Sequence, residues 1–507
     1  MKEKNEEDAD ANCHVRKIEQ LKLAGFDPFP AQRFSPSHTA SDILALDEAG
    51  LGQGVEVSLA GRIRSIRSSG KLCFVDLYSA GTIIQLMINH SVCPDAAVIL
   101  PLLRAGDFIG VHGSITRSKR GQLSINTSSL VVLGKSIIDL PLSRISKNRF
   151  QEFGGVSDTG ILRRSRHLEL LNNPEVRHRF IQRSHIVSSI RRFFDQRGFL
   201  EVDVPIITPY YGGAAARPFI SHVNSVDQDW FLRISPELDL KRLLVGGFER
   251  VYCLGSNFRN EDIDKSHQPA FTMIEWYQAW SDYEEQLLLF EELVEKLAVD
   301  FCGSPIVPFR NKSVDFSRPW KRIRVIDAVA SAIKIPAEEI ERWASDDDGE
   351  LAMKLLFEGN NLSWDVSIPF DWGMCVSILF EELAEEDLSW DPVFIMDHPQ
   401  SISPLTKPHR DGKLLYSERF EPFAGGMEIG NAYSELNDPV LQRELLEGDT
   451  HHGYAVDQHF LDAMDAGMPQ AGGVGLGVDR VIQILTNTPH IQDVILFPMT
   501  RRLDESK

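Results

Sequence analysis

SNFRNEDIDKSHQPAFTMIEWY, residues 256–277, is the stretch that decides the fold. The apolar run 251–254 leads into it, and the alternating run 271–277 closes it. Between these runs lies a polar segment that carries charges of both signs and one proline. Two such runs around a polar segment predict a strand, a long hairpin loop and a second strand.

Four side chains in this hairpin can carry chemistry. Side chains alternate between the two faces of a strand, so Arg259 and Glu261 are expected to share one face, as are Glu275 and Tyr277. A guanidinium, two carboxylates and a phenol then converge on one sheet surface. A salt-bridged surface hairpin would account for the same charges, so further motifs must decide between structure and function.

The composition is that of an ordinary globular protein with room for two or three domains. The 507 residues are 43% hydrophobic and 25% charged, and no apolar run approaches the length of about 18 residues that a membrane helix needs. The acidic N-terminus resembles neither a signal peptide nor a transit peptide. Six scattered cysteines without a Cys-x-x-Cys pair imply neither disulfides nor a zinc site. These features predict a cytoplasmic protein without a membrane partner.

The formal charge of −20 argues against general coating of nucleic acid, which depends on neutralising phosphates. A local basic surface is still possible between residues 56 and 139, where basic side chains outnumber acidic ones. The basic residues there include Arg62, Arg64, Arg67, Lys71, Arg104, Arg117, Lys119, Arg120 and Lys135. We expect any RNA to bind in this segment.

Residues 55–140 contain five short alternating runs separated by Gly or Ser clusters. This spacing predicts a small Greek-key barrel of the oligonucleotide-binding type, which binds single strands through a basic groove and aromatic stacking. Phe74 could supply a stacking ring and Gln85 a base-edge amide. On the pattern alone, both could equally be ordinary barrel surface.

A helix is predicted from Asn173, which can cap it with Pro174 in its first turn, to Gly198. A strand is predicted from Phe199 to Ile207, with Pro205 near its end. A plain core helix explains the first pattern as well as a dimerisation unit does.

A second predicted helix carries an acidic first turn. Ser235 is expected to be its N-cap, Pro236 its first residue and Glu237 part of its first turn, where the helix dipole favours an anion.

Residues 418–438 predict a hairpin that turns at Gly425-Gly426 and places Glu421 opposite Glu428. Facing carboxylates repel each other, so a cation is expected between them, and Mg²⁺ with phosphate oxygens completing its shell fits. Beyond Glu428, three further polar residues follow at strand period on one face: Asn431, Tyr433 and Glu435. A glycine-rich strand then enters an apolar helix over residues 471–486, which as a glycine pattern alone is a weak signal.

Together these segments resemble class II aminoacyl-tRNA synthetases, and in detail lysyl-tRNA synthetases, from about residue 15 to 503. The hairpin at 256–277 resembles the second signature motif, the 173–207 unit the first, and the Gly-x-Gly-x-Asp-Arg run ending at Arg480 the third. The resemblance implies an α+β fold: an antiparallel-sheet catalytic domain with an N-terminal five-stranded barrel. The predicted parts are an appended helix and loop (1–54), the barrel (55–140), a linker (141–172) and the catalytic domain (173–507) with a helical insertion at about 280–385.

The resemblance also implies an activity and assigns roles. Lysine, ATP and lysine tRNA are the expected substrates, through a lysyl-adenylate, with Mg²⁺ as cofactor and a homodimer as the assembly. The residues expected to be catalytic are Arg259, Glu428 and Arg480. Those expected at ATP are Arg259, Glu261, His267, Phe271, Glu421, Glu428 and Arg480, with Mg²⁺ on Glu421 and Glu428. Those expected at lysine are Gly213, Glu237, Arg259, Glu275, Tyr277, Asn431, Tyr433 and Glu435. Those expected at the anticodon are Arg67, Phe74, Gln85 and Gln122.

Five positions depart from the family pattern: Gln122, Asp239, Asp262, Gln268 and Ala270. Two alternatives stay open beside the lysine–tRNA ligase. One is a paralogue that lysylates a protein such as elongation factor P, although relatives of that kind lack the barrel. The other is a non-catalytic RNA-binding relative, although the loss of Arg259, Glu428 or Arg480 that would favour it is not seen.

Overall fold

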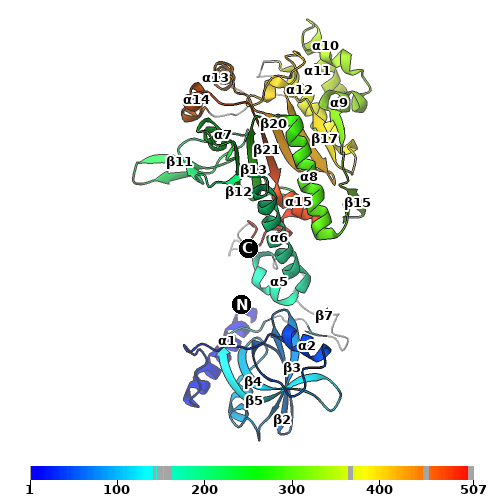
Figure 1. Cartoon of the computed structure of the whole chain (residues 1–507). Helices are drawn as coiled ribbons and strands as arrows, with labels where there is room; N and C mark the ends of the chain where they lie inside the picture. The colour runs from blue at the N-terminus through cyan, green and yellow to red at the C-terminus, as the bar shows by residue number, and fades with distance from the viewer. Residues whose placement is uncertain are drawn as a thin grey trace. The chain divides into compact units, whose positions relative to one another are not determined.

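The computed structural model describes residues 2–140, 144–145, 152–153, 163–363, 369–448 and 456–500. The chain forms two compact units, residues 1–176 and 177–507, shown in Figure 1. Most of the predicted linker at 141–172 lies outside the described residues.

The first unit is built on a closed five-stranded barrel in the order β1-β2-β3-β5-β4. The strands are β1 Glu56–Ser69, β2 Leu72–Ser79, β3 Thr82–Asn89, β4 Phe108–Arg117 and β5 Leu123–Gly134. Inward-facing aliphatic side chains fill the barrel, and the alternation of buried and half-buried residues along β2 follows the period of two that the sequence predicted. The predicted five-stranded barrel is confirmed. The unit also contains α1 Lys2–Leu23, α2 Ala40–Glu48, α3 Ala96–Ile99, β6 Arg144–Ile145, β7 Glu152–Phe153 and α5 Arg166–Asn172.

The second unit is organised by a nine-stranded, mainly antiparallel sheet. Its order is β16-β17-β18-β20-β21-β13-β12-β8, and β19 pairs with β18. The bounds are β8 Leu200–Glu201, β12 Arg250–Phe258, β13 Ala270–Ala279, β16 Lys321–Arg324, β17 Val393–Met396, β18 Arg419–Ala424, β19 Met427–Glu428, β20 Gly430–Ser434 and β21 Ala471–Gly477. The predicted antiparallel catalytic sheet is therefore confirmed.

The two faces of this sheet have different partners. Alternate residues of β12 and β13, such as Tyr252 and Trp276, join the main core with three helices: α6 Pro174–Asp195, α8 Tyr283–Cys302 and α15 Val478–Leu485. The opposite face, which carries Val251 and Tyr277, packs on α7 Glu237–Val245 and α14 Gln458–Asp465. Because the pleat alternates, one strand supplies both the core and the floor of a possible site.

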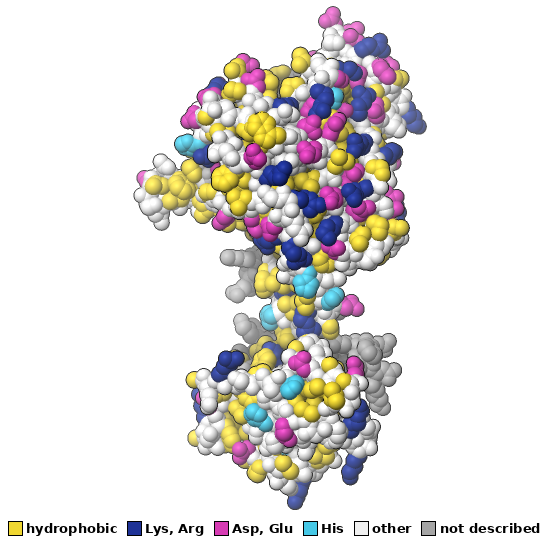
Figure 2. All heavy atoms as spheres, viewed as in Figure 1, with side chains coloured by type: hydrophobic (Ala, Val, Ile, Leu, Met, Phe, Trp, Pro, Cys, Tyr) yellow, Lys and Arg dark blue, Asp and Glu magenta, His cyan; other side chains and the backbone are white. Residues whose placement is uncertain are grey.

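The remaining elements of this unit form smaller sheets and a mainly helical region. The strands are β9 Ile207–Thr208, β10 Ile220–Val223, β11 Gln228–Leu232, β14 Ile306–Phe309 and β15 Lys312–Asp315. The helices are α9 Val325–Ile333, α10 Ala337–Arg342, α11 Gly349–Gly359, α12 Trp372–Leu379 and α13 Pro439–Gly448. Figure 2 shows acidic and basic side chains interspersed over the visible face of this unit.

Helix α6 begins at Pro174 as predicted, and the Asn173 side chain accepts hydrogen bonds from Glu175 N (3.1 Å) and Val176 N (3.3 Å). The single strand predicted from Phe199 to Ile207 is wrong. β8 and β9 are two-residue strands in different sheets. Pro205 between them has no N–H to donate to a continuous ladder.

Candidate active site

The hairpin that decides the fold is formed by β12 and β13, paired in register from Arg250–Gln278 to Phe258–Ala270. The sequence predicted that Arg259 and Glu261 lie on the first strand. β12 instead ends at Phe258, so both residues lie just beyond it. The strand ends because the backbone N–H groups change their hydrogen-bond acceptors at this point. Arg259 N still donates to Pro269 O (3.0 Å), but Asn260 N donates to Arg217 O (2.7 Å).

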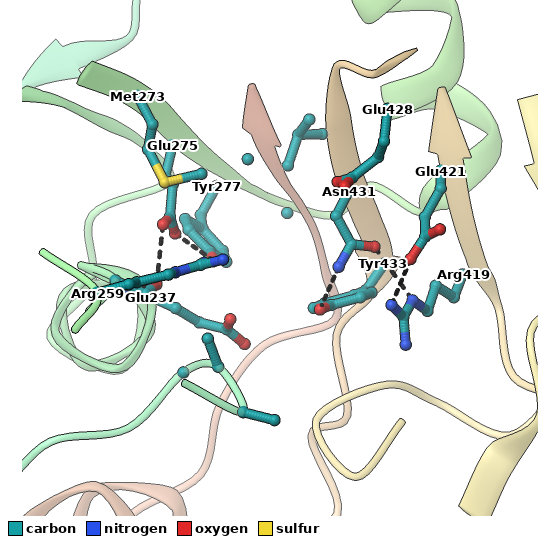
Figure 3. A pocket seen from close by; sticks show the side chains of 17 residues that line it. Glu237, Arg259, Met273, Glu275, Tyr277, Arg419, Glu421, Glu428, Asn431 and Tyr433 are labelled. Atoms are coloured by element: carbon teal, nitrogen blue, oxygen red, sulfur yellow. Dashed lines mark hydrogen bonds and ion pairs between the residues drawn. The ribbon is translucent and has the colours of Figure 1, made fainter. Parts of the chain in front are cut away.

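A cavity of about 260 Å³ lies over β13, β20 and β21. Figure 3 shows Glu237, Arg259, Glu275 and Tyr277 on one side of it, and Glu421, Glu428, Asn431 and Tyr433 on the other. Of the eight residues predicted at lysine, seven line this cavity. The eighth, Glu435, does not. The structure thus brings together side chains from segments that are far apart in the sequence.

One end of the cavity is acidic. Glu275 accepts hydrogen bonds from Ser235 Oγ (2.8 Å) and from Tyr277 OH (3.2 Å). Helix α7 begins at Glu237, one residue later than predicted, and Ser235 Oγ accepts from Glu237 N (3.0 Å). Gly213 closes this end at φ +84°, where a Cβ would come within 3.0 Å of Glu237 Cβ, so a side chain is excluded there.

Burial changes the protonation of this end. Burial, assisted by the charge of Glu237, raises the pKa of Glu275 to about 7, although hydrogen bonds from Ser235 and Tyr277 oppose the rise. Burial and the neighbouring carboxylates raise the pKa of Tyr277 well above its ordinary value, so its phenol stays protonated and can donate. Such shifts are frequent in binding sites for charged ligands.

Glu435 lies behind the cavity wall and is fully buried. Its Oε2 lies 2.5 Å from Nζ of Lys241 on α7. It lies directly behind Gly473, a residue of the cavity lining, because a Cβ on Gly473 would come within 2.0 Å of Glu435 Oε1. Sequence analysis did not single out Lys241, since no local pattern reveals that a helix residue will pair with a strand residue so distant in the chain.

Arg259 forms no ion pair with a carboxylate in the part of the chain that the structure describes, although four glutamates line the same cavity. Its Nε is buried and has no acceptor among those residues. Its Cζ lies 5.4 Å from the centre of the Phe271 ring. A guanidinium held without an anion is an anion-binding group, and its planar fork suits a carboxylate or a phosphate.

The opposite wall is held by Arg419, which sequence analysis did not select. Arg419 donates to Asn431 Oδ1 (3.1 Å), Ser403 Oγ (3.0 Å) and Glu421 Oε1 (2.5 Å). Asn431 Nδ2 in turn donates to Tyr433 OH (2.9 Å). Strand period could have found this arginine, because Arg419 and Glu421 stand two residues apart on one strand face.

A second cavity of about 230 Å³ adjoins the first and shares Arg259 and Glu428 with it. It holds the remaining residues predicted at ATP except Glu421, namely Glu261, His267, Phe271 and Arg480. An aromatic ring and a guanidinium that line one cavity can sandwich a flat aromatic ligand.

Hydrogen bonds fix the Arg480 guanidinium. It donates to Glu428 O (2.6 Å) and Oε2 (3.2 Å), and its Nη2 lies 3.1 Å from His267 Nε2. His267 Nδ1 lies 2.8 Å from Asp264 Oδ2. Partial burial raises the pKa of Asp264, but hydrogen bonds from Ser266 and His267 outweigh this and lower it to about 2. The Asp264 carboxylate therefore stays ionised, and His267 donates through Nδ1 while Nε2 accepts from Arg480.

The hairpin pattern predicted that Glu421 lies directly opposite Glu428, and this prediction is wrong. Glu428 pairs with Phe423, and Glu421 pairs with Ile395. The two-residue turn at Gly425-Gly426, both at positive φ, sets Phe423 opposite Glu428, so Glu421 lies two residues further along the strand and the two carboxylates are diagonal on one face. Both line the first cavity and a third one of about 440 Å³.

In the first unit, three of the predicted anticodon residues, Arg67, Phe74 and Gln85, lie on adjoining strands. Arg67 of β1 is opposite Phe74 of β2, and Asp76, two residues on, is opposite Gln85 of β3. Arg67 Nη2 lies 3.2 Å from the Asp76 carboxylate. Gln85 is buried and its Oε1 accepts from Ser124 Oγ (3.0 Å). Gln122 precedes β5, and its carbonyl oxygen accepts from the same hydroxyl.

The departures from the family pattern in the second unit have local explanations. Asp239 forms an i,i+3 ion pair with Arg242 (2.9 Å). Gln268 is buried, and its Oε1 accepts from Met499 N (3.1 Å). Asp262 lines the second cavity, and Ala270 is the first residue of β13.

Comparison with known proteins identifies the family. Residues 158–501 match the model of class II tRNA synthetases (D, K and N), and residues 57–133 match the OB-fold nucleic acid binding domain. A lysine–tRNA ligase of Clostridium perfringens (strain SM101) is 40% identical over 95% of this chain and 94% of its own length. The lysine–tRNA ligases of Moorella thermoacetica and Roseiflexus sp. (strain RS-1) are each 39% identical over 97% of this chain and over 97% and 98% of their own lengths. The chain belongs to the class II tRNA synthetase family.

Proposed function

We propose that this chain ligates L-lysine to its tRNA through a lysyl-adenylate, with ATP as the second substrate and AMP and pyrophosphate as products. The observation that carries the proposal is the first cavity. Carboxylates at one end face a guanidinium that has no anion among the described residues. A ligand with both ammonium groups and a carboxylate matches that arrangement, and full-length relatives are named lysine–tRNA ligases.

Each end of lysine has a partner in this proposal. Glu237 receives the α-ammonium group, while Glu275, Tyr277 and Glu435 receive the ε-ammonium group beside Gly473. Asn431 and Tyr433 close the side of the cavity. A site that satisfies a buried polar group can reject analogues that lack it by about 10⁴-fold. Aspartate or asparagine would need cationic or amide groups where this cavity has carboxylates.

The reaction needs positioning and charge stabilisation and no protein nucleophile. The lysine carboxylate attacks the α-phosphorus of ATP, and pyrophosphate leaves. Arg259 is common to both cavities, so it can contact the carboxylate and the α-phosphate together. Phe271 and Arg480 hold adenine, with Glu261 and His267 at its edge. The terminal ribose hydroxyl of the tRNA then attacks the lysyl carbonyl and releases AMP.

Glu421 and Glu428 fit a magnesium ion. They are hard oxygen donors on one face, they line the same cavities, and Mg²⁺ is usually held by one or two carboxylates with phosphates and waters completing the shell. The ion, when bound, would neutralise phosphate charge. Arg419 and Arg480 keep the two carboxylates oriented.

The barrel is proposed to bind the anticodon through Arg67, Phe74 and Gln85, which lie on adjoining strands, and through Gln122, whose backbone oxygen accepts from Ser124 Oγ beside Gln85. Its match to a nucleic-acid-binding fold supports this role.

No described helix is long and apolar enough to cross a membrane. The cytoplasmic location stays a prediction.

We further propose a homodimer formed through the segment that follows α6. Leu200, Ile206 and Ile207 are each between 45% and 49% exposed there, and a partner subunit would cover them. Light scattering should give twice the 57.1 kDa of the chain. A mass of one chain at micromolar concentration would contradict the dimer.

Lysine-dependent exchange of labelled pyrophosphate into ATP tests the function without tRNA. We expect exchange with lysine and none above background with aspartate or asparagine. Absence of exchange with lysine, or faster exchange with another amino acid, would refute the proposal. Transfer of lysine to an elongation factor in place of tRNA would support the paralogue instead.

A further inference from the structure

Lys241 is a fully buried cation beside the proposed lysine site. Its Nζ lies 2.7 Å from Glu237 Oε1, 2.5 Å from Glu435 Oε2 and 3.4 Å from Leu405 O. Burial lowers the pKa of a lysine, but here Glu237 and Glu435 raise the pKa of Lys241 above its ordinary value. The ammonium group therefore stays charged and bridges two carboxylates.

The two carboxylates that Lys241 bridges are those proposed to receive the two ends of the substrate. Glu237 lines the cavity where the α-ammonium group is placed. Glu435 lies behind Gly473, where the ε-ammonium group is placed. The bridged oxygens can be no further apart than the sum of the two distances, 5.2 Å. One internal ammonium group thus ties together both recognition points.

The charges around the proposed lysine site show what the Lys241 ammonium group contributes to the charge balance. On the side of the cavity proposed to hold lysine, away from Arg419, Glu421 and Glu428 on the opposite wall, three buried carboxylates (Glu237, Glu275 and Glu435) are opposed by Lys241 and Arg259. This leaves one excess negative charge there when all are ionised. Lysine carries two ammonium groups and one carboxylate, so it brings one positive charge and balances the site. Without Lys241 the excess would be two, and a proton or a second cation would be drawn in.

We propose that Lys241 is a positioning residue that fixes the spacing and the charge of Glu237 and Glu435, and thereby sets the preference for lysine over ornithine, which is one methylene shorter. This inference rests on the proposed function. Lys241 does not line the cavity, so it acts through the two glutamates and not by touching the substrate.

The surrounding groups support an effect on pH dependence as well as on spacing. Burial raises the pKa of Glu435, Lys241 opposes that rise, and Glu237 and Glu275 add to it. Loss of the ammonium group therefore pushes the titration of the carboxylates to higher pH. The titratable and charged groups around this cluster come from α7 (Glu237), β13 (Glu275 and Tyr277), β18 (Arg419), β20 (Tyr433) and the residues that directly follow β12 and β20 (Arg259 and Glu435).

The test compares K241M with K135M in the full-length chain. Lys135 is a matched control, because its side chain is also fully buried and paired with a buried carboxylate, Asp107, but in the first unit. Pyrophosphate exchange is measured for lysine and ornithine from pH 6 to 9. For K241M we expect the KM for lysine to rise at least tenfold, the lysine-to-ornithine ratio of kcat/KM to fall at least tenfold, and the pH dependence of KM to move upward by about one unit. K135M should keep all three values of the wild type.

Equal changes in K241M and K135M, or a wild-type ratio and pH profile in K241M, would overturn the inference. If K241M does not fold, K241R decides. It keeps the charge but enlarges the bridge, so the pH profile should stay while the lysine-to-ornithine ratio changes, and an unchanged ratio would refute the spacing role. Absence of lysine-dependent exchange in the wild-type protein would refute the proposed function. Normal exchange in the wild type, together with wild-type kinetics in the Lys241 variants, would refute this inference alone.

Discussion

Arg259 is the residue on which the proposed adenylation depends most directly, because it lines both cavities and has no carboxylate partner among the described residues. In R259K the point charge is kept but the two-pronged donor geometry is lost. We expect kcat/KM for pyrophosphate exchange to fall about 10²- to 10³-fold, the scale on which single donors to a transition state act. R242K, in an exposed pair with Asp239, is the control and should behave as the wild type.

Glu275 makes lysine binding depend on pH. Its pKa in the empty site is about 7, above its ordinary value, so below pH 7 the carboxylate carries a proton that an arriving ammonium group must displace. The KM for lysine should fall roughly tenfold per pH unit per displaced proton from pH 6 to 7 and level off above pH 8. Exchange kinetics across this range measure it.

The same shift has the opposite sign for the stability of the empty protein. The folded state holds the Glu275 proton more tightly than the unfolded chain, so this stabilisation is complete below about pH 4.5 and is lost as the pH rises to about 7. The rise in melting temperature caused by lysine should therefore grow from pH 6 to 8. E275Q should reduce the pH dependence, leaving the part that Glu435 contributes, whereas E291Q, at a buried carboxylate of α8 that accepts from Trp320 N, should keep it in full.

At the scale of the element, the glycines of β21 matter because they leave space that a side chain would fill. A Cβ at Gly473 would come within 2.0 Å of Glu435 Oε1 and 2.3 Å of the Tyr277 ring, so G473A closes the path to Glu435. We expect the KM for lysine to rise more than tenfold with little change in the KM for ATP. In G477A, on the same strand, the new Cβ meets nothing closer than 3.7 Å, and the KM for lysine should stay unchanged. Equal effects of both variants would contradict this account.

Elements also mark where the sequence was and was not informative. The period of two along β13 and β20 correctly predicted that Glu275 and Tyr277, and Asn431 and Tyr433, share faces, because a pleat leaves no other arrangement. The ends of strands were not predictable in this way. β12 stops before Arg259 because Arg217, from a segment with no pattern of its own, takes over the backbone hydrogen bond of Asn260.

At the scale of the whole molecule, the fold class followed from the sequence, whereas the buried charge network did not. The alternating runs at 55–140 predicted the barrel from local pattern, whereas the antiparallel catalytic sheet was implied by the family resemblance. The bridge between Lys241 and Glu435 joins a helix to a distant strand, and only tertiary packing shows that both side chains enter the same interior. The net charge likewise did not show where charges of one sign gather, since a chain with a formal charge of −20 still has a segment rich in arginine and lysine.

The two units should also separate in function. Phe74 is half-buried on the outer face of the barrel, opposite Arg67, so its ring can stack on a base. Loss of one stacked base weakens binding by about 1–3 kcal/mol, or roughly 5- to 150-fold. F74A should therefore raise the KM for tRNA in aminoacylation by that factor and leave lysine-dependent exchange unchanged, because adenylation uses cavities lined only by the second unit. V131A, at an exposed position on β5, is the control and should keep both activities. A parallel loss of exchange in F74A would show that the barrel supports the catalytic unit and does not only bind tRNA.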